Sequence, residues 1–236
     1  MKKINKLRYI LLAALLLLTG GIVRAQMGEQ RHNFAVGVNG GVNLSSVSFQ
    51  PSVNQKNLMG INAGLTARYI SEKYFSMICG AQVEVNLSQR GWSEVSNDYP
   101  QLSYERRMNY VEVPFLAHIA FGRDRGLQFF IHAGPQIGFL LGDKETIDDD
   151  VWNEVINQGA AIEVTQHHKK IDNKFDYGIA GGAGLELRTK AGNFLLEGRY
   201  YYALADFYGN TKKDYFGRSA HGVITVKLAY LFDLKK

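Results

Sequence analysis

The stretch Asn109-Tyr110-Val111-Glu112-Val113-Pro114-Phe115-Leu116-Ala117-His118-Ile119-Ala120-Phe121 separates into two rows when every second residue is taken. One row is entirely apolar and runs from Val111 to Phe121. The other row is mixed and contains Glu112 and His118. A period of two predicts a β-strand, because successive side chains leave opposite faces of the pleat. In a soluble barrel the apolar row would point inward, so the rest of the chain must decide which face it occupies.

Seven more segments alternate in the same way. With the opening one, they cover residues 34–44, 59–69, 75–88, 109–121, 128–141, 175–188, 194–204 and 221–232. Each is long enough to cross a bilayer as a tilted strand, which takes about 9–11 residues. The polar rows hold Gly, Asn, Gln, Glu and Arg, which could not fill a dry soluble core without partners. Aromatic residues near the ends of the apolar rows are typical of interfacial girdles. We therefore expect the apolar rows to face lipid.

The connections between these segments alternate between short and long. Residues 71–73, 122–126 and 190–192 are short connections, whereas 45–56, 90–108, 142–174 and 206–218 are long. Outer-membrane barrels have tight periplasmic turns and long outer loops. The sequence thus predicts an all-β fold, an eight-stranded antiparallel up-and-down transmembrane barrel with both termini in the periplasm and the 142–174 loop outside.

The N-terminus has the pattern of a secretory signal peptide. Lys2, Lys3, Lys6 and Arg8 precede an apolar stretch over residues 10–18, and Val23-Arg24-Ala25 provides a small-x-small cleavage site. The apolar stretch is too short for a comfortable membrane anchor, and no cysteine follows the site to carry a lipid. We expect cleavage after Ala25, which leaves residues 1–25 as signal peptide and 26–236 as the barrel domain.

Removal of this segment changes the charge of the protein. The chain has 27 Lys and Arg against 22 Asp and Glu, and five of the basic residues but no acidic ones precede Gln26. The mature chain is therefore formally neutral, so its charge gives no reason to expect a nucleic-acid partner. Cys79 is the only cysteine and cannot form an intrachain disulfide. Beyond the signal, no apolar stretch is long enough for a transmembrane helix.

The inward rows carry a set of ionisable residues, for which we expect a structural role. They are Arg68, Glu84, Glu112, His118, His132, Glu186, Arg188, Glu197, Arg199 and Lys227. Eight strands enclose a lumen that side chains fill. The short turn after Lys190 should bring Glu186 and Arg188 within reach of Glu197 and Arg199. We expect a charge-paired plug in preference to an ion path, with no cofactor or metal.

Pro114 and Pro135 fall inside predicted strands, although proline cannot donate to a ladder and a closed barrel has no edge. Folding the two strands about Asp124 places Pro114 opposite Gly134 and Pro135 beside Val113. Two missing donors at one height predict a bulge or a loosened seam, more plausibly structural than a gate.

Three groups could carry chemistry. Asp148-Asp149-Asp150 lacks the glycine and terminal glutamate of a calcium loop, so a solvated acidic loop is the better interpretation. The two imidazoles of His167-His168-Lys169-Lys170 should point apart, which favours surface polarity over a metal site. Ser219 and His221, with Asp206 or Asp214, form a weak match to the triad of a lipid A deacylase. Both side chains should point inward, so we expect no catalytic residues.

The chain resembles the PorT-like outer-membrane β-barrel proteins, often named the porin family. The resemblance rests on the stretch from Asn109 to Leu116, on Gly134-Pro135-Gln136-Ile137-Gly138, on residues 176–186 and on Glu197-Gly198-Arg199-Tyr200. It extends from about Phe34 to Phe232. The founding member implies a non-enzymatic role in export by the type IX secretion route, and the family implies no catalytic residues.

These observations lead to one expected function and two alternatives. We expect a non-catalytic scaffold of the outer membrane that presents loops, with lipid or lipopolysaccharide and secretion-machinery proteins as partners. A small solute channel is the first alternative, and a lipid-modifying enzyme acting through Ser219 and His221 is the second. No residue pattern in the chain points to nucleic acid.

Overall fold

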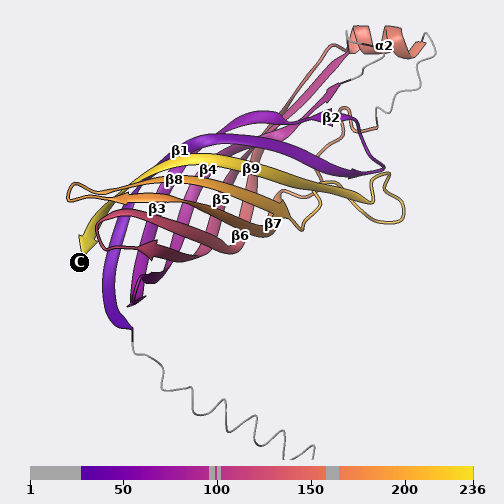
Figure 1. Ribbon diagram of the computed structural model, residues 1–236. Coiled ribbons are helices and arrows are strands. Elements are labelled where there is room, and N and C mark those ends of the chain that lie inside the picture. The colour runs from indigo at the N-terminus through magenta and orange to yellow at the C-terminus, as the bar shows by residue number, and fades with distance from the viewer. Residues whose placement is uncertain (1–27, 96–98, 100–101, 158–164, 236) are drawn as a thin grey trace, which may run out of the picture.

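The computed structural model describes residues 28–95, 99, 102–157 and 165–235, which form one closed, all-antiparallel β-barrel (Figure 1). The strands are β1 (Glu29–Gln50), β2 (Gln55–Lys56), β3 (Leu58–Tyr74), β4 (Met77–Val95), β5 (Ser103–Gly122), β6 (Gly126–Ile147), β7 (Phe175–Arg188), β8 (Asn193–Ala203) and β9 (Arg218–Lys235). One helix, α2 (Asp149–Asn157), follows β6.

Eight of these strands make the barrel wall. Each pairs with its neighbours in the order β1-β3-β4-β5-β6-β7-β8-β9, and β1 pairs with β9 to close the ring. The two-residue β2 is separated from β3 only by Asn57. It pairs with Ser93 and Glu94 of β4, beyond the part of β4 that pairs with β3. The predicted eight-stranded up-and-down topology is therefore confirmed.

The part of β5 over residues 109–121 faces as predicted. Along β5, Phe115, Ile119 and Phe121 are exposed, whereas Glu112 and His118 are buried. The same alternation exposes apolar side chains around the whole wall, such as Leu65 on β3 and Leu196 on β8. Because polar residues are buried and apolar residues are exposed, the barrel has the inverted pattern of a membrane-spanning wall.

Several strands continue well beyond the lipid-facing band, and this corrects the predicted loops. The long connection expected over residues 90–108 is mostly the ends of β4 and β5, and β6 runs on to Ile147 before α2 begins. β1 likewise reaches Gln50. Figure 1 shows β4, β5 and β6 rising past the rest of the wall to the helix. The short connections at the other end lie close to where they were predicted.

The side-chain pattern reverses where these extensions begin. On β1 the outward residues change from Val42 and Leu44 to Ser48, and the inward ones change from Asn43 to Val47 and Phe49. An extension that leaves the bilayer meets water outside, so it places polar side chains outward and can bury aromatic ones within. Our expectation of continuous loops overlooked this second period-two pattern.

The two prolines interrupt different ladders without a bulge. On β5, Pro114 lies opposite Gln136, two residues from the predicted partner, because the turn centres on Arg125 and pairs Gly122 with Gln128. The β4–β5 pairing has a gap at Pro114, and the β5–β6 pairing has a gap at Pro135, yet the register is kept across both. The loosened seam is therefore present, and the predicted bulge and pairing are wrong.

Residues 1–27 lie outside the described part of the chain, so cleavage after Ala25 remains a prediction. In the part described, no helix has the length and apolarity needed to span a bilayer.

Candidate functional site

The barrel lumen is the candidate site, and its first layer lies at the end where β1 begins and β9 ends. Small and larger apolar side chains from several strands pack against one another there. The members are Ala35, Ile70, Ile78, Ala120, Phe130, Leu195 and Leu231. This layer closes the lumen above the periplasmic mouth.

The next layer is a network of buried charges centred on Glu84. The Glu84 carboxylate accepts hydrogen bonds from both terminal nitrogens of Arg199 at 2.8 and 3.0 Å, and from Lys227 Nζ at 2.6 Å. Arg199 Nε also donates to Glu197 Oε1 at 2.7 Å. Because every member is less than a tenth exposed, each charge depends on its partners for stabilisation.

Two further sets of contacts extend this layer across the lumen. Arg68 donates to both carboxylate oxygens of Glu186, each at 2.6 Å. His118 Nδ1 lies 2.7 Å from His132 Nε2, and His132 Nδ1 lies 3.3 Å from Glu197 Oε1. The network therefore joins residues from strands on opposite sides of the barrel.

The side-chain ion pairs predicted between β7 and β8 are wrong, although the two strands are neighbours. Glu186 meets Arg68 across the lumen, and Arg199 meets Glu84, in place of a Glu186–Arg199 contact. Side chains that point into a narrow lumen reach the facing wall as readily as their neighbour strand. Arg188 lies at the edge of the predicted cluster, at the periplasmic mouth, 3.7 Å from Glu186 and 3.9 Å from Asp233.

A third layer is built around Arg90, which is not among the ionisable residues predicted for the lumen. Its guanidinium is fully buried, lies 2.9 Å from Asp176 and 3.5 Å from Glu112, and stacks 3.7 Å from the centre of the Tyr110 ring. Tyr201 donates a hydrogen bond to Asp176 at 3.0 Å. Arg90 continues the inward row of Gln82 to Ser88, so extending that row by one step would have found it.

The outermost layer is an aromatic plug inside the extended strands. We define the plug by its buried members: Val47, Phe49, Trp92, Leu102, Tyr104, Met108, Tyr110, Leu140, Trp152, Val155, Ile171, Phe207, Tyr208 and Phe216. Trp92 is completely buried, with its ring 5.1 Å from that of Phe49 and 5.8 Å from that of Phe207. Two residues of α2 and several of the outer loops contribute to it, so the loops are packed into the mouth.

Polar contacts hold the loops onto the plug. Arg106 donates to Asp143 Oδ2 at 2.5 Å, to the Lys169 carbonyl at 2.6 Å and to the Tyr208 hydroxyl at 2.9 Å. Burial raises the pKa of the Tyr208 phenol, which stays protonated. His167 stacks 4.2 Å from Tyr104 and makes a 3.0 Å contact with Glu94.

The residues considered for a catalytic triad make local structural contacts instead. Ser219 Oγ accepts from the Tyr208 amide and Asp206 accepts from the Ser219 amide, while buried His221 lies between Tyr110 and Phe207. Among the described residues, no Asp or Glu contacts His221, so the triad geometry is not assembled. Asp214 lies instead at Thr211, whose hydrogen bonds lower the pKa of its carboxyl.

The acidic and histidine motifs also have local partners. Asp148 accepts from the Val151 amide at 3.3 Å, at the start of α2. The two imidazoles point apart as predicted, because His167 reaches Glu94 and His168 reaches Glu145. Surface polarity was wrong for His167, whose side chain is almost fully buried. No group of three metal-ligating side chains forms within the ranges that the structure describes.

Space inside the wall is small. A cavity of ≈ 10 Å³ lies between the Glu84 and Arg90 layers, lined in part by Glu112, Tyr201 and Lys227. This is room for about one water molecule. A wider vestibule of ≈ 570 Å³ opens at the periplasmic mouth, with Arg31, Asp124 and Arg188 among its lining residues. The layers between it and the outer loops fill the lumen.

A comparison with protein families agrees with this architecture. The model of the outer membrane protein beta-barrel domain family matches residues 24–209. Among solved structures, the chain is similar to Ail of Yersinia pestis, at 14% identity over 88% of this chain and 100% of Ail, with a TM-score of 0.38. It is also similar to OprG of Pseudomonas aeruginosa, at 10% identity over 87% of this chain and 98% of OprG, with a TM-score of 0.45.

The Neisserial surface protein A is a third similar structure, at 10% identity over 84% of this chain and 97% of that one, with a TM-score of 0.42. Curated proteins gave no significant match. The family match covers most of the sequence, and its members are integral proteins of the outer membrane. The chain belongs to the outer membrane protein beta-barrel domain family and is an integral outer-membrane protein.

Proposed function

We propose that this protein is a non-catalytic scaffold of the outer membrane, which presents its outer loops and helix to partner proteins in type IX protein export. The observation that carries the scaffold role is the filling of the lumen. Charged pairs, the Arg90 layer and the aromatic plug occupy the space that a solute path would need. The export role rests on the resemblance to PorT-like proteins.

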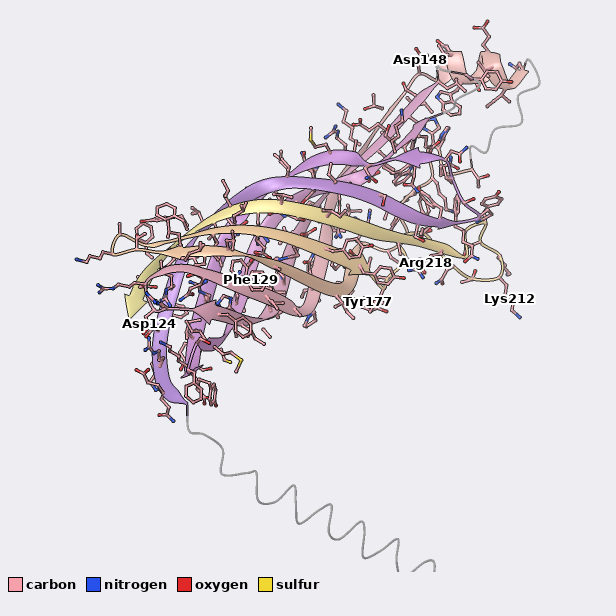
Figure 2. All side chains as sticks on the ribbon, in the orientation of Figure 1. Asp124, Phe129, Asp148, Tyr177, Lys212 and Arg218 are labelled. Carbon is pink, nitrogen blue, oxygen red and sulfur yellow. The ribbon has the colours of Figure 1, made fainter. Side chains whose placement is uncertain are left out.

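The outer end offers a surface for such partners. In α2, Trp152 and Val155 are buried in the plug, whereas Asn153 is exposed. Figure 2 places Asp148, next to the helix, at the tip of the extended strands and Asp124 at the opposite end of the molecule. The packing beneath the helix fixes its position, so the exposed face is presented in one orientation.

Deletion and cross-linking test the two parts of the proposal separately. In the native host, deletion should stop the release of type IX cargo, and the wild-type gene should restore it. Cargo release that continues after deletion would contradict the export role. A photo-reactive residue at Asn153 should form adducts with protein, whereas one at lipid-facing Phe115 should not. Absence of adducts at Asn153 would contradict the scaffold role.

A further inference from the structure

A groove of ≈ 450 Å³ lies on the outer flank of the barrel, where the wall is lowest. β7 begins only at Phe175 and β8 ends at Ala203, while β6 and β9 on either side continue further outward. The groove is lined by the residues just before β7 and just after β8, among them Lys174, Phe175, Leu204 and Asp206. It is separate from the filled lumen.

The groove has one apolar side and one charged side. Phe175, Tyr177 and Leu204 are each about half exposed and belong to the lipid-facing rows of the wall. Lys174 and Asp206 lie beyond them, on the side of the outer loops. Figure 2 shows Tyr177 on the flank of the barrel and Lys212 on the β8–β9 loop further out. An outer-leaflet lipid, with acyl chains below its headgroup, has the same order of polarity.

The carboxylates of this region are already engaged by hydrogen-bond donors. Asp172 Oδ2 accepts from the Gly209 amide at 2.8 Å. Asp206 accepts from the Ser219 amide at 2.6 Å and from Asn210 at 2.9 Å. The Asn173 side chain donates to the Asp206 carbonyl at 2.8 Å, which ties the two sides of the groove together. The groove is therefore a fixed feature of the folded loops.

Four lysines of the same loops lack such partners among the described residues. Lys170, Lys174, Lys212 and Lys213 are exposed, and none makes an ion pair within the described part of the chain. Lys174 lines the groove, and Lys212 and Lys213 follow its lining residue Asn210 by two and three positions. A lysine at the rim of an apolar groove, with two more on the adjoining loop, complements an anionic headgroup.

We propose that this groove binds one phosphorylated glycolipid of the outer leaflet, with its acyl chains against Phe175, Tyr177 and Leu204 and a phosphate at Lys174. The site does not depend on the proposed scaffold function, because a channel or an enzyme with this wall would carry it equally. The neighbouring lysines Lys212 and Lys213 add attraction for a second phosphate or for the acidic sugars of the headgroup.

Native mass spectrometry of the detergent-purified protein with added lipid A tests the site. Bisphosphorylated lipid A should bind at least tenfold more tightly than its dephosphorylated form. The variant Lys174→Gln with Lys212→Gln and Lys213→Gln should lose tenfold or more in affinity, because it removes the cations that would meet the phosphates. The control Lys190→Gln, in the periplasmic turn, should bind as the wild type does.

A second variant tests the groove without changing its charge. Ala205 lines the groove, so Ala205→Trp should fill it and weaken lipid A binding. Retention of the heat-modifiable gel shift will show that each variant is folded. Equal binding of both lipid A forms, unchanged affinity in the triple lysine variant, or binding that EDTA abolishes while Lys174→Gln does not, would overturn the proposal.

Discussion

Arg68 and Glu186 form a bidentate ion pair across the lumen, with both partners almost completely buried. Glu186→Gln should lower the free energy of unfolding by about 3–5 kcal/mol, because it leaves a buried guanidinium without its counter-charge. Urea unfolding of the protein folded in lipid vesicles measures this loss.

The double variant Arg68→Met with Glu186→Leu provides the matched comparison. It removes both charges and should recover most of the lost stability. A double variant as unstable as Glu186→Gln would mean that the loss does not come from an unpaired buried charge. That result would contradict our account of this layer.

Asp124 joins the β5–β6 turn to the opposite side of the periplasmic mouth. It accepts hydrogen bonds from Lys73 at 2.8 Å and from Arg31 at 3.0 Å, and the pKa of its carboxyl is lowered first by the bond from Lys73 and then by that from Arg31. A carboxyl with a lowered folded-state pKa stabilises the fold above its ordinary pKa, near 3.8, and loses that contribution as the pH falls through the folded value.

Asp124→Asn should therefore reduce stability at pH 7 by at most about 1 kcal/mol, because the pair is partly exposed and screened. The deficit should shrink below about pH 4 and vanish at lower pH. Unfolding midpoints of the variant and the wild type across this range provide the measurement. A deficit that grows with acid would contradict the assignment.

At the scale of single strands, the backbone of β6 passes close to that of β5 at Gly134. A Cβ on Gly134 would lie 2.0 Å from the Phe115 carbonyl oxygen. Gly134→Ala should cost about 1–3 kcal/mol, since the backbone must move to admit the methyl group. Gly198→Ala on β8 is the control, because a Cβ there meets nothing within 4 Å. Equal unfolding midpoints for the two variants would contradict this close approach.

The extended strands depend on the plug that they enclose. Trp92→Ala should cost about 3–5 kcal/mol and expose the outer loops to protease, because Trp92 is completely buried among the rings of Phe49, Tyr104 and Phe207. Lys212→Ala, on an exposed loop, should leave the cleavage rate unchanged. Protease resistance of the loops in Trp92→Ala would show that the plug does not hold them.

The sequence was most informative about the membrane-spanning part of each strand. Alternation identified the eight strands and the inward position of residues such as Glu84 and Arg199, because lipid imposes one polarity on every outward row. Partners across the lumen could not be read in this way, since they depend on barrel diameter and on how the strands are staggered. The shift at Pro114 arose from the same limit, a turn whose centre lies one residue later than assumed.

The plug escaped prediction for a different physical reason. Its members come from strand extensions, outer loops and α2, which are far apart in sequence and meet only in the closed ring. Part of the signal was available: Val47 and Phe49 on β1, and Tyr104 and Met108 on β5, continue the inward rows with apolar side chains. The loop residues Phe207, Tyr208 and Phe216 follow no periodic pattern, so their burial could be recognised only in the folded structure.

In the whole molecule, successive layers of side chains close the lumen from one mouth to the other. Above the periplasmic vestibule lie an apolar layer, a charged network, the Arg90 layer and the aromatic plug. Between the two charged layers, the cavity of ≈ 10 Å³ has room for about one water molecule. The filled lumen is the observation on which the proposed platform rests, and we expect these layers to resist ion flow.

Single-channel recording in planar bilayers tests this closed lumen most directly. Barrels counted as inserted by an independent fluorescence label should give no conductance steps in concentrated potassium chloride at either polarity, while a porin in the same bilayers gives stable steps. Reproducible steps from the wild-type protein, scaling with the number of labelled barrels, would contradict the filled lumen and favour a channel.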